Sequence, residues 1–180
     1  MKPSRHIESL LLGIAICLAV APAQAAAACK GAGEAVGPAS LSEAERAVVC
    51  LINEERRRHG RKALDSNSKL GDAASAHSRH MVSSGRFSHT GSGGSSPNER
   101  INKSGYLKGT NRWGVGETIG YQTGNDSSPR KIVAGWMKSS GHRSIILDGR
   151  YRDVGIGVKR GIPGGGANGG GTYTADFGYR

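Results

Sequence analysis

Aromatic side chains are scarce in this chain of 180 residues, where tryptophan, tyrosine and phenylalanine together make up 5%. A core with so few large rings has to be built mainly from Ala, Val, Ile and Leu. Hydrophobic residues account for 36% and charged residues for 22%, a balance that excludes a collagen, a coiled coil and a bundle of membrane helices. The length predicts one domain, alone or with a targeting segment.

Acidic residues are also few, because 14 Asp and Glu stand against 25 Lys and Arg and give a formal net charge of +11. This excess excludes an acidic protein and favours anionic partners. No stretch alternates basic and aromatic residues, so we expect no nucleic-acid binding. Arg56, Arg57 and Arg58 fall at the end of an expected helix, where the helix dipole favours cations, and a dedicated binding patch is the alternative.

Long hydrophobic runs are absent except at residues 10–20, which follow Lys2 and Arg5 and precede small residues up to Ala25. This layout predicts a signal peptide over residues 1–25. The run is too short for the ~20 residues that span a bilayer, so we expect no transmembrane span in the mature protein. A lipoprotein cleaved before Cys29 is the weaker alternative, because the leucine usual at the start of a lipobox is missing.

Cysteine is almost absent, and of the three in the chain Cys17 leaves with the signal peptide. The remaining pair, Cys29 and Cys50, predicts a disulfide in an oxidising compartment. It would tie an N-terminal arm over residues 26–41 to the first helix of a domain over residues 42–180. The long spacing and the lack of further cysteines exclude a redox pair and a zinc knuckle. We expect a secreted protein, extracellular or associated with the cell wall.

Hydrophobic spacing predicts helices interleaved with a small sheet, an α+β fold whose sheet we expect to be antiparallel. Ser42 and Glu45 have the spacing of a capping box and predict the start of the first helix, which Gly60 ends. The glycine-rich residues 161–171 are expected to be a floppy hairpin connector. The remaining expected helices cover residues 68–84, 97–103, a segment from 129 and a short turn from 141, and the expected strands cover residues 113–121, 154–159 and 172–177.

Two short motifs predict chemistry that we reject. Residues 66–69, 96–98 and 103–105 follow the motif order of penicillin-binding serine enzymes, but they are crowded together and the chain is too short for that fold. His77 and His80 are three residues apart with no glutamate between them, whereas the zinc-protease helix needs histidines four apart around a glutamate base. We expect His77 at the edge of the core and His80 in solvent.

Three ionisable residues, His89, Glu117 and His142, each lie on or beside a turn and are flanked by small residues. Polar groups surrounded by Gly and Ser are well suited to converge on a cleft. Two imidazoles and a carboxylate can bind a divalent metal with an open position, or can perform general acid–base catalysis. They are the candidate cleft and metal-binding residues, with Glu117 and His142 as the catalytic candidates.

The order and spacing of several motifs cover nearly the whole mature chain and resemble a known family. The chain is similar to bacterial members of the CAP superfamily, which includes cysteine-rich secretory proteins, antigen 5 and plant pathogenesis-related proteins. The motifs that carry the resemblance are LINEER (residues 51–56), AHSRHM (76–81), FSH (87–89), GETI (116–119), WMKSSGHR (136–143) and VGIGV (154–158).

The resemblance implies a three-layer α-β-α sandwich with a small antiparallel sheet, secretion, and a central cleft. In many members that cleft carries two histidines and two glutamates. The histidines map onto His89 and His142 here, and one of the glutamates maps onto Glu117. The fourth cleft acid has no counterpart, because serines follow Trp136 where it is expected. In addition, Thr118 replaces the usual Asn and His80 replaces an Asp common in bacterial relatives.

Three hypotheses for function follow. The first is a secreted, non-catalytic, monomeric binding module whose cleft takes a divalent cation, a lipid or a cell-wall ligand, with anionic cell-wall polymers or lipid as partners. The second is a zinc-assisted hydrolase, protease-like, in which His89 and His142 hold zinc or another divalent cation and Glu117 is a ligand or base. The third is an extracellular protein that interacts through its loops. The missing acid and the positive charge favour the first.

Overall fold

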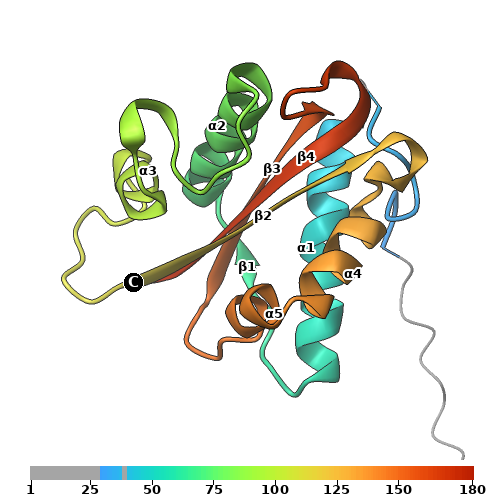
Figure 1. The fold of residues 1–180 in the computed structure, drawn as a ribbon. Helices are drawn as coiled ribbons and strands as arrows, with labels where there is room; N and C mark the ends of the chain where they lie inside the picture. Colours follow the sequence, from blue (N-terminus) through green and yellow to red (C-terminus); the bar gives the residue numbers. More distant parts are fainter. Residues whose placement is uncertain (1–28, 38–39) are drawn as a thin grey trace, which may run out of the picture.

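The computed structural model describes residues 29–37 and 40–180, so the expected signal peptide lies outside the described residues. The described part of the chain runs through five α-helices, four strands and two short 3₁₀ turns (Figure 1). The helices are α1 (Leu41–Arg58), α2 (Ser68–Ser84), α3 (Pro97–Lys103), α4 (Pro129–Lys138) and α5 (Ser140–Ile146), and the 3₁₀ turns are η1 (Ser92–Gly94) and η2 (Gly124–Ser127). The strands are β1 (Asp65–Ser66), β2 (Gly114–Thr123), β3 (Asp153–Ile162) and β4 (Gly166–Tyr179).

The sheet has the order β1-β3-β4-β2 and lies between two helical layers (Figure 1). Helices α2 and α3 cover one face, and α1, α4 and α5 lie on the other. The three long strands pair antiparallel, as expected, whereas the two-residue β1 pairs parallel with β3 and was not predicted. The predicted three-layer α-β-α sandwich is therefore confirmed.

Two apolar clusters hold the layers together. The larger lies between the sheet and α1 and α4, and includes Ile52, Trp136 and Phe177. The smaller joins α2 to α3 and to the chain that follows α3, around Leu70 and Tyr106. The sheet separates the two clusters, and the smaller one lies on the face covered by α2. On that face, buried polar side chains of β2 and β4 lie next to the smaller cluster.

Helix α2 lies directly on β3 because two strand residues have no side chain. A Cβ at Gly155 would overlap the backbone of Leu70 and Gly71, and a Cβ at Gly157 would overlap the backbone of Ser75. Ser78 of α2 donates a hydrogen bond of 2.9 Å to the Gly157 carbonyl. These contacts fix the position of α2 on the sheet.

The start of α1 differs from the prediction. The helix begins at Leu41, and its N-cap, Ser40, makes no side-chain cap hydrogen bond. The carboxylate of Glu45 instead accepts a 3.2 Å hydrogen bond from the backbone of Val158 in β3. The expected Ser42–Glu45 capping box is therefore wrong, because a tertiary contact takes the glutamate.

Arg56 is fully buried, whereas Arg57 and Arg58 are exposed. Its guanidinium donates hydrogen bonds to the carbonyls of Lys62 (2.8 Å), Ile146 (2.6 Å) and Asp148 (3.0 Å). Helix polarity alone therefore does not explain this residue, because it joins the end of α1 to the end of α5.

The glycine-rich residues 161–171 do not form the floppy connector that we expected. Strand β3 continues to Ile162, β4 begins at Gly166, and only residues 163–165 form the turn. Glycine permits this extension because neighbouring atoms approach closely: a Cβ at Gly171 would lie 2.9 Å from a methyl carbon of Val36.

The predicted Cys29–Cys50 disulfide is confirmed, with sulfurs 1.97 Å apart, and it fastens the N-terminal arm to α1. The arm also bonds to α4, because Arg130 donates its backbone N–H to the Ala32 carbonyl at 2.9 Å. No helix in the described part of the chain is long and apolar enough to cross a bilayer.

Candidate functional site

The buried carboxylate of Glu117 is the centre of the candidate site. Strand β2 carries it on the face covered by α2, and its side chain is 1% exposed. His89 Nδ1–H donates to Glu117 Oε1 at 2.7 Å, and Arg100 Nη2 donates to Oε2 at 2.5 Å. Burial would raise the pKa of Glu117, but the hydrogen bond from His89 and the positive charge of Arg100 outweigh burial and lower the pKa below its usual value.

Arg100 holds the segment before α3 in place. It projects from α3 and its side chain is 10% exposed. Its Nη1 donates to the backbone carbonyls of His89 at 3.0 Å and Ser95 at 2.8 Å. One guanidinium therefore bonds both to Glu117 and to the loop that carries His89, so the geometry of the His89–Glu117 pair depends on Arg100.

His77 of α2 is the third side chain near the Glu117 carboxylate. Its Nε2 lies 2.9 Å from the Ser88 carbonyl and 3.9 Å from Glu117 Oε1. Burial lowers the pKa of His77, against the opposing effect of the Glu117 charge. The expectation that His77 lies at the edge of the core agrees with its burial, but His80 is half-buried, with its ring centroid 6.4 Å from that of His77, rather than in solvent.

A second acid, Asp176, lies directly across from Glu117 in the β2–β4 register. It is completely buried. Burial, together with the negative charge of Glu117, raises the pKa of Asp176 well above its usual value, which favours the protonated form. Neither Asp176 oxygen has a hydrogen-bond partner among the described residues, and protonation lets the two carboxyls lie side by side without repulsion between two negative charges. This acid was not predicted from the sequence.

His142, in the first turn of α5, is half-buried. Burial lowers the pKa of His142, and so does the nearby charge of His89. It borders a groove of about 260 Å³ whose walls include Phe87, Tyr121 and Trp136. Phe87 and Tyr121 are exposed and meet edge to face, with ring centroids 4.9 Å apart.

A family model described as "CAP: Cysteine-rich secretory protein family" matches residues 49–176 of this chain. The chain belongs to the CAP family. The match includes His89, Glu117, His142, Arg100 and Asp176, so all five lie within the CAP domain.

Two curated proteins of Bacillus subtilis are similar to this CAP domain. The uncharacterized protein YkwD is 32% identical over 120 residues, which cover 67% of this chain and 44% of YkwD. The uncharacterized membrane protein YlbC is 28% identical over 137 residues, which cover 71% of this chain and 38% of YlbC. The chain therefore spans less than half the length of either relative.

Solved structures show the same CAP fold. An extracellular protein of Bacillus anthracis that contains an SCP domain has 24% identity and a TM-score of 0.60, over 79% of this chain and 44% of that chain. An outer surface protein of Borrelia burgdorferi has 16% identity and a TM-score of 0.62, over 82% of this chain and 98% of that chain.

The residues that could bind a metal in this CAP domain are not preassembled as a three-ligand group. The described residues contain one group of three potential ligands whose atoms lie within 4.8 Å of one another: Cys29, Cys50 and Glu54. The two sulfurs of this group already form the disulfide. At the cleft, both Glu117 oxygens are hydrogen-bonded. His89 and His142 therefore remain as the accessible ligands.

Proposed function

We propose that this CAP domain is a secreted, non-catalytic binding module that holds a divalent cation at His89 and His142. The observation that carries the proposal is the hydrogen bond from His89 Nδ1 to the buried Glu117 carboxylate. A histidine that donates one ring nitrogen to a carboxylate presents the lone pair of the other, as metal-ligating histidines in proteins generally do. The His89 side chain is 51% exposed, so a metal ion can reach it from solvent.

His142 suits the role of second ligand because its lowered pKa favours the neutral imidazole at neutral pH, the form that binds metals. Two imidazoles with open coordination positions are compatible with zinc, which could polarise a bound water or ligand oxygen. Glu117 would orient His89 rather than touch the ion.

The acids at the cleft favour binding over hydrolysis. A base that activates a bound water needs a free carboxylate oxygen within hydrogen-bond reach. Glu117 uses its two oxygens for His89 and Arg100, and Asp176 is fully buried, with a raised pKa that favours its protonated form. The zinc-assisted hydrolase, in which Glu117 is the base, would require Glu117 to leave Arg100.

Calorimetric titration of Zn²⁺ into the oxidised protein tests the cation site. We expect one-to-one binding that is lost in the His89→Ala, His142→Ala double variant. The control is His59→Ala, because His59 lies at the end of α1 and bonds its own helix at the Glu55 carbonyl. Absent zinc binding, or equal binding by the double variant, would disprove the site.

Secretion is the second part of the proposal. Its support is the signal-like N-terminus and a disulfide of the kind that persists in oxidising compartments. Removal of residues 1–25 takes away Lys2, Arg5 and Glu8, hence one net positive charge, and leaves +10. Such a charge would attract the protein to anionic cell-wall polymers. We expect N-terminal sequencing of the exported protein to begin at Ala26, and salt washes to release it from cell walls.

A further inference from the structure

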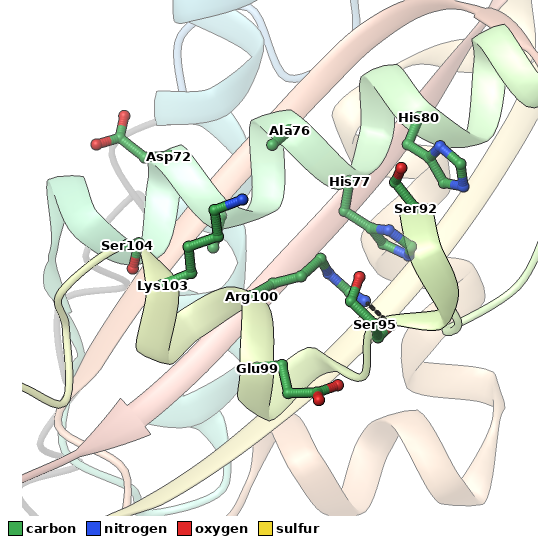
Figure 2. Close-up of a pocket in the computed structure, with 11 residues that line it drawn as sticks. Asp72, Ala76, His77, His80, Ser92, Ser95, Glu99, Arg100, Lys103 and Ser104 are labelled. Atoms are coloured by element: carbon green, nitrogen blue, oxygen red, sulfur yellow. Dashed lines mark hydrogen bonds between the residues drawn. The ribbon is translucent and has the colours of Figure 1, made fainter.

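A cavity of about 430 Å³ lies between α2 and α3 (Figure 2). Its lining includes Ala76 and His77 of α2 and Arg100 and Lys103 of α3. The turn η1 closes one end through Ser92. The volume falls within the roughly 300–1,000 Å³ typical of small-molecule sites. This cavity is separate from the groove beside His142, which lies among β2, α4 and α5.

Two residues that line this cavity, His77 and Arg100, each have a buried polar atom, Nδ1 and Nε, without a hydrogen-bond partner among the described residues. The His77 side chain is completely buried, and that of Arg100 is nine-tenths buried. Unpaired polar atoms at such depth are rare, because each one loses its interaction with water without replacement.

The two atoms require opposite partners. His77 Nε2 faces the Ser88 carbonyl and must carry the ring proton, so Nδ1 of the neutral ring is an acceptor that needs a donor. Arg100 Nε carries a hydrogen and needs an acceptor. A ligand that satisfies both must donate and accept hydrogen bonds.

The mouth of the cavity adds groups of the same mixed character. Ser92 and Ser104 contribute hydroxyls, Lys103 contributes an ammonium group and Asp72 a carboxylate. Neither Lys103 nor Asp72 forms an ion pair within the described residues. A small ligand of a single charge would meet a like charge here, and an alkyl chain would leave His77 Nδ1 and Arg100 Nε unpaired.

We propose that this cavity binds a saccharide unit of one or two rings. Each sugar hydroxyl both donates and accepts, so one can donate to His77 Nδ1 while another accepts from Arg100 Nε. Ala73 and Ala76 provide a small apolar surface for the C–H groups of the ring. Inorganic sulfate carries no proton at neutral pH and so cannot donate a hydrogen bond to His77 Nδ1. The proposal stands independently of the cation site, because it does not involve His89 or His142.

The test is a nuclear magnetic resonance titration of the ¹⁵N-labelled, oxidised chain with glucose, N-acetylglucosamine and its β-1,4-linked disaccharide. The signals to follow are the side-chain nitrogens His77 Nδ1 and Arg100 Nε. We expect at least one saccharide to shift both signals saturably and inorganic sulfate to shift neither. No shift with any of the three sugars, which leaves a cavity that holds water only, overturns the proposal. So does a shift with sulfate alone, which marks an anion site.

Two tryptophan variants on α2 locate the binding. Ala76→Trp fills the cavity from its exposed wall, whereas Arg79→Trp adds the same ring to an exposed position of α2 that does not line the cavity. We expect Ala76→Trp to weaken saccharide binding at least tenfold and Arg79→Trp to leave it unchanged. Dispersed backbone amide spectra verify that both variants fold. Equal binding by the two variants would place the sugar elsewhere and refute the proposal.

Discussion

His89 Nδ1 and Glu117 Oε1 lie 2.7 Å apart, although one residue is in a loop and the other in a strand 28 positions later. The imidazole is half exposed, whereas the carboxylate is buried beneath it. A buried acid therefore orients an exposed histidine. Arg100 donates hydrogen bonds both to the Glu117 carboxylate and to the backbone carbonyl of His89. The proposed cation ligand His89 therefore depends on two groups, Glu117 and Arg100, that would not touch the cation.

Glu117→Gln tests that dependence. The amide cannot neutralise Arg100, and a buried ion pair that loses one partner typically destabilises a protein by about 3–5 kcal/mol. We expect a loss near the lower end, about 3 kcal/mol in urea denaturation, because the amide oxygen still accepts one hydrogen bond. Zinc affinity should fall about 10–100-fold, the usual effect of removing such an orienting partner.

The control for this change is Glu55→Gln. Glu55 pairs with Arg58 at 2.6 Å on the surface of α1, where the arginine side chain is 60% exposed. Exposed pairs contribute at most about 1 kcal/mol, so we expect little change in stability and none in zinc affinity. Similar losses in both variants would contradict the role given to Glu117.

Asp176→Asn should change the pH dependence of stability. The pKa of Asp176 is raised in the folded chain, so the folded state keeps a proton that the unfolded state releases above its ordinary pKa of 3.8. Stability of the wild type therefore falls as pH rises from there through the folded pKa. Asparagine has no proton to lose. The free energy of unfolding of the variant should therefore rise relative to that of the wild type by up to about 1.4 kcal/mol per pH unit.

Urea denaturation between about pH 4 and pH 8 measures this divergence. Asp126→Asn is the matched comparison, since Asp126 is exposed and pairs with Lys131 on the surface. We expect its difference from the wild type to stay flat. A constant difference for Asp176→Asn as well would mean that the folded chain carries Asp176 ionised.

Loss of the disulfide should destabilise the chain markedly. Cys29 and Cys50 are separated by 21 positions, and closing a loop of about this length stabilises a protein by about 3 kcal/mol. We expect the Cys29→Ala, Cys50→Ala variant to unfold at lower urea concentration by that free energy. A thiol reductant should lower the free energy of unfolding of the wild type to that of the variant and leave the variant unchanged. A further loss of stability in the variant would contradict this account.

Two glycine-to-alanine changes should have opposite signs. At Gly157 the added Cβ would overlap the backbone of α2, so the helix has to move and the chain should lose about 3 kcal/mol. Gly135, in α4, has open space around a Cβ, and alanine there should stabilise by about 1 kcal/mol through helix propensity. Thermal unfolding compares the two; a neutral Gly157→Ala would show that α2 does not depend on this contact.

Local signals predicted the helices best. The bounds of α2 and α3 match the expected residues 68–84 and 97–103, because cap residues and apolar spacing are properties of adjacent residues. Glu45 shows the limit of this approach, since its partner Val158 is 113 positions away. Strand β1 is too short to have a period at all.

The candidate site was only partly predictable for the same reason. His89 and Glu117 could be proposed from their small neighbours and from a family resemblance, and they prove to be in contact. Arg100 looked like one basic residue among many until α3 aimed it at Glu117. Asp176 was hidden in a strand, although a lone acid between Ala175 and Phe177 is unusual in a buried segment and was an available signal.

The facing carboxyls also bear on how the sheet assembles. Glu117 and Asp176 are paired on the face that meets α2, while Ala175 and Phe177 point into the larger apolar cluster. A slip of β2 by one residue would turn Glu117 onto that apolar face, far from His77 and Arg100. Burying a charge there without a partner is strongly unfavourable. Glu117 thus makes every shift of β2 by an odd number of residues energetically unfavourable. It favours the correct register of this strand before any ligand is bound.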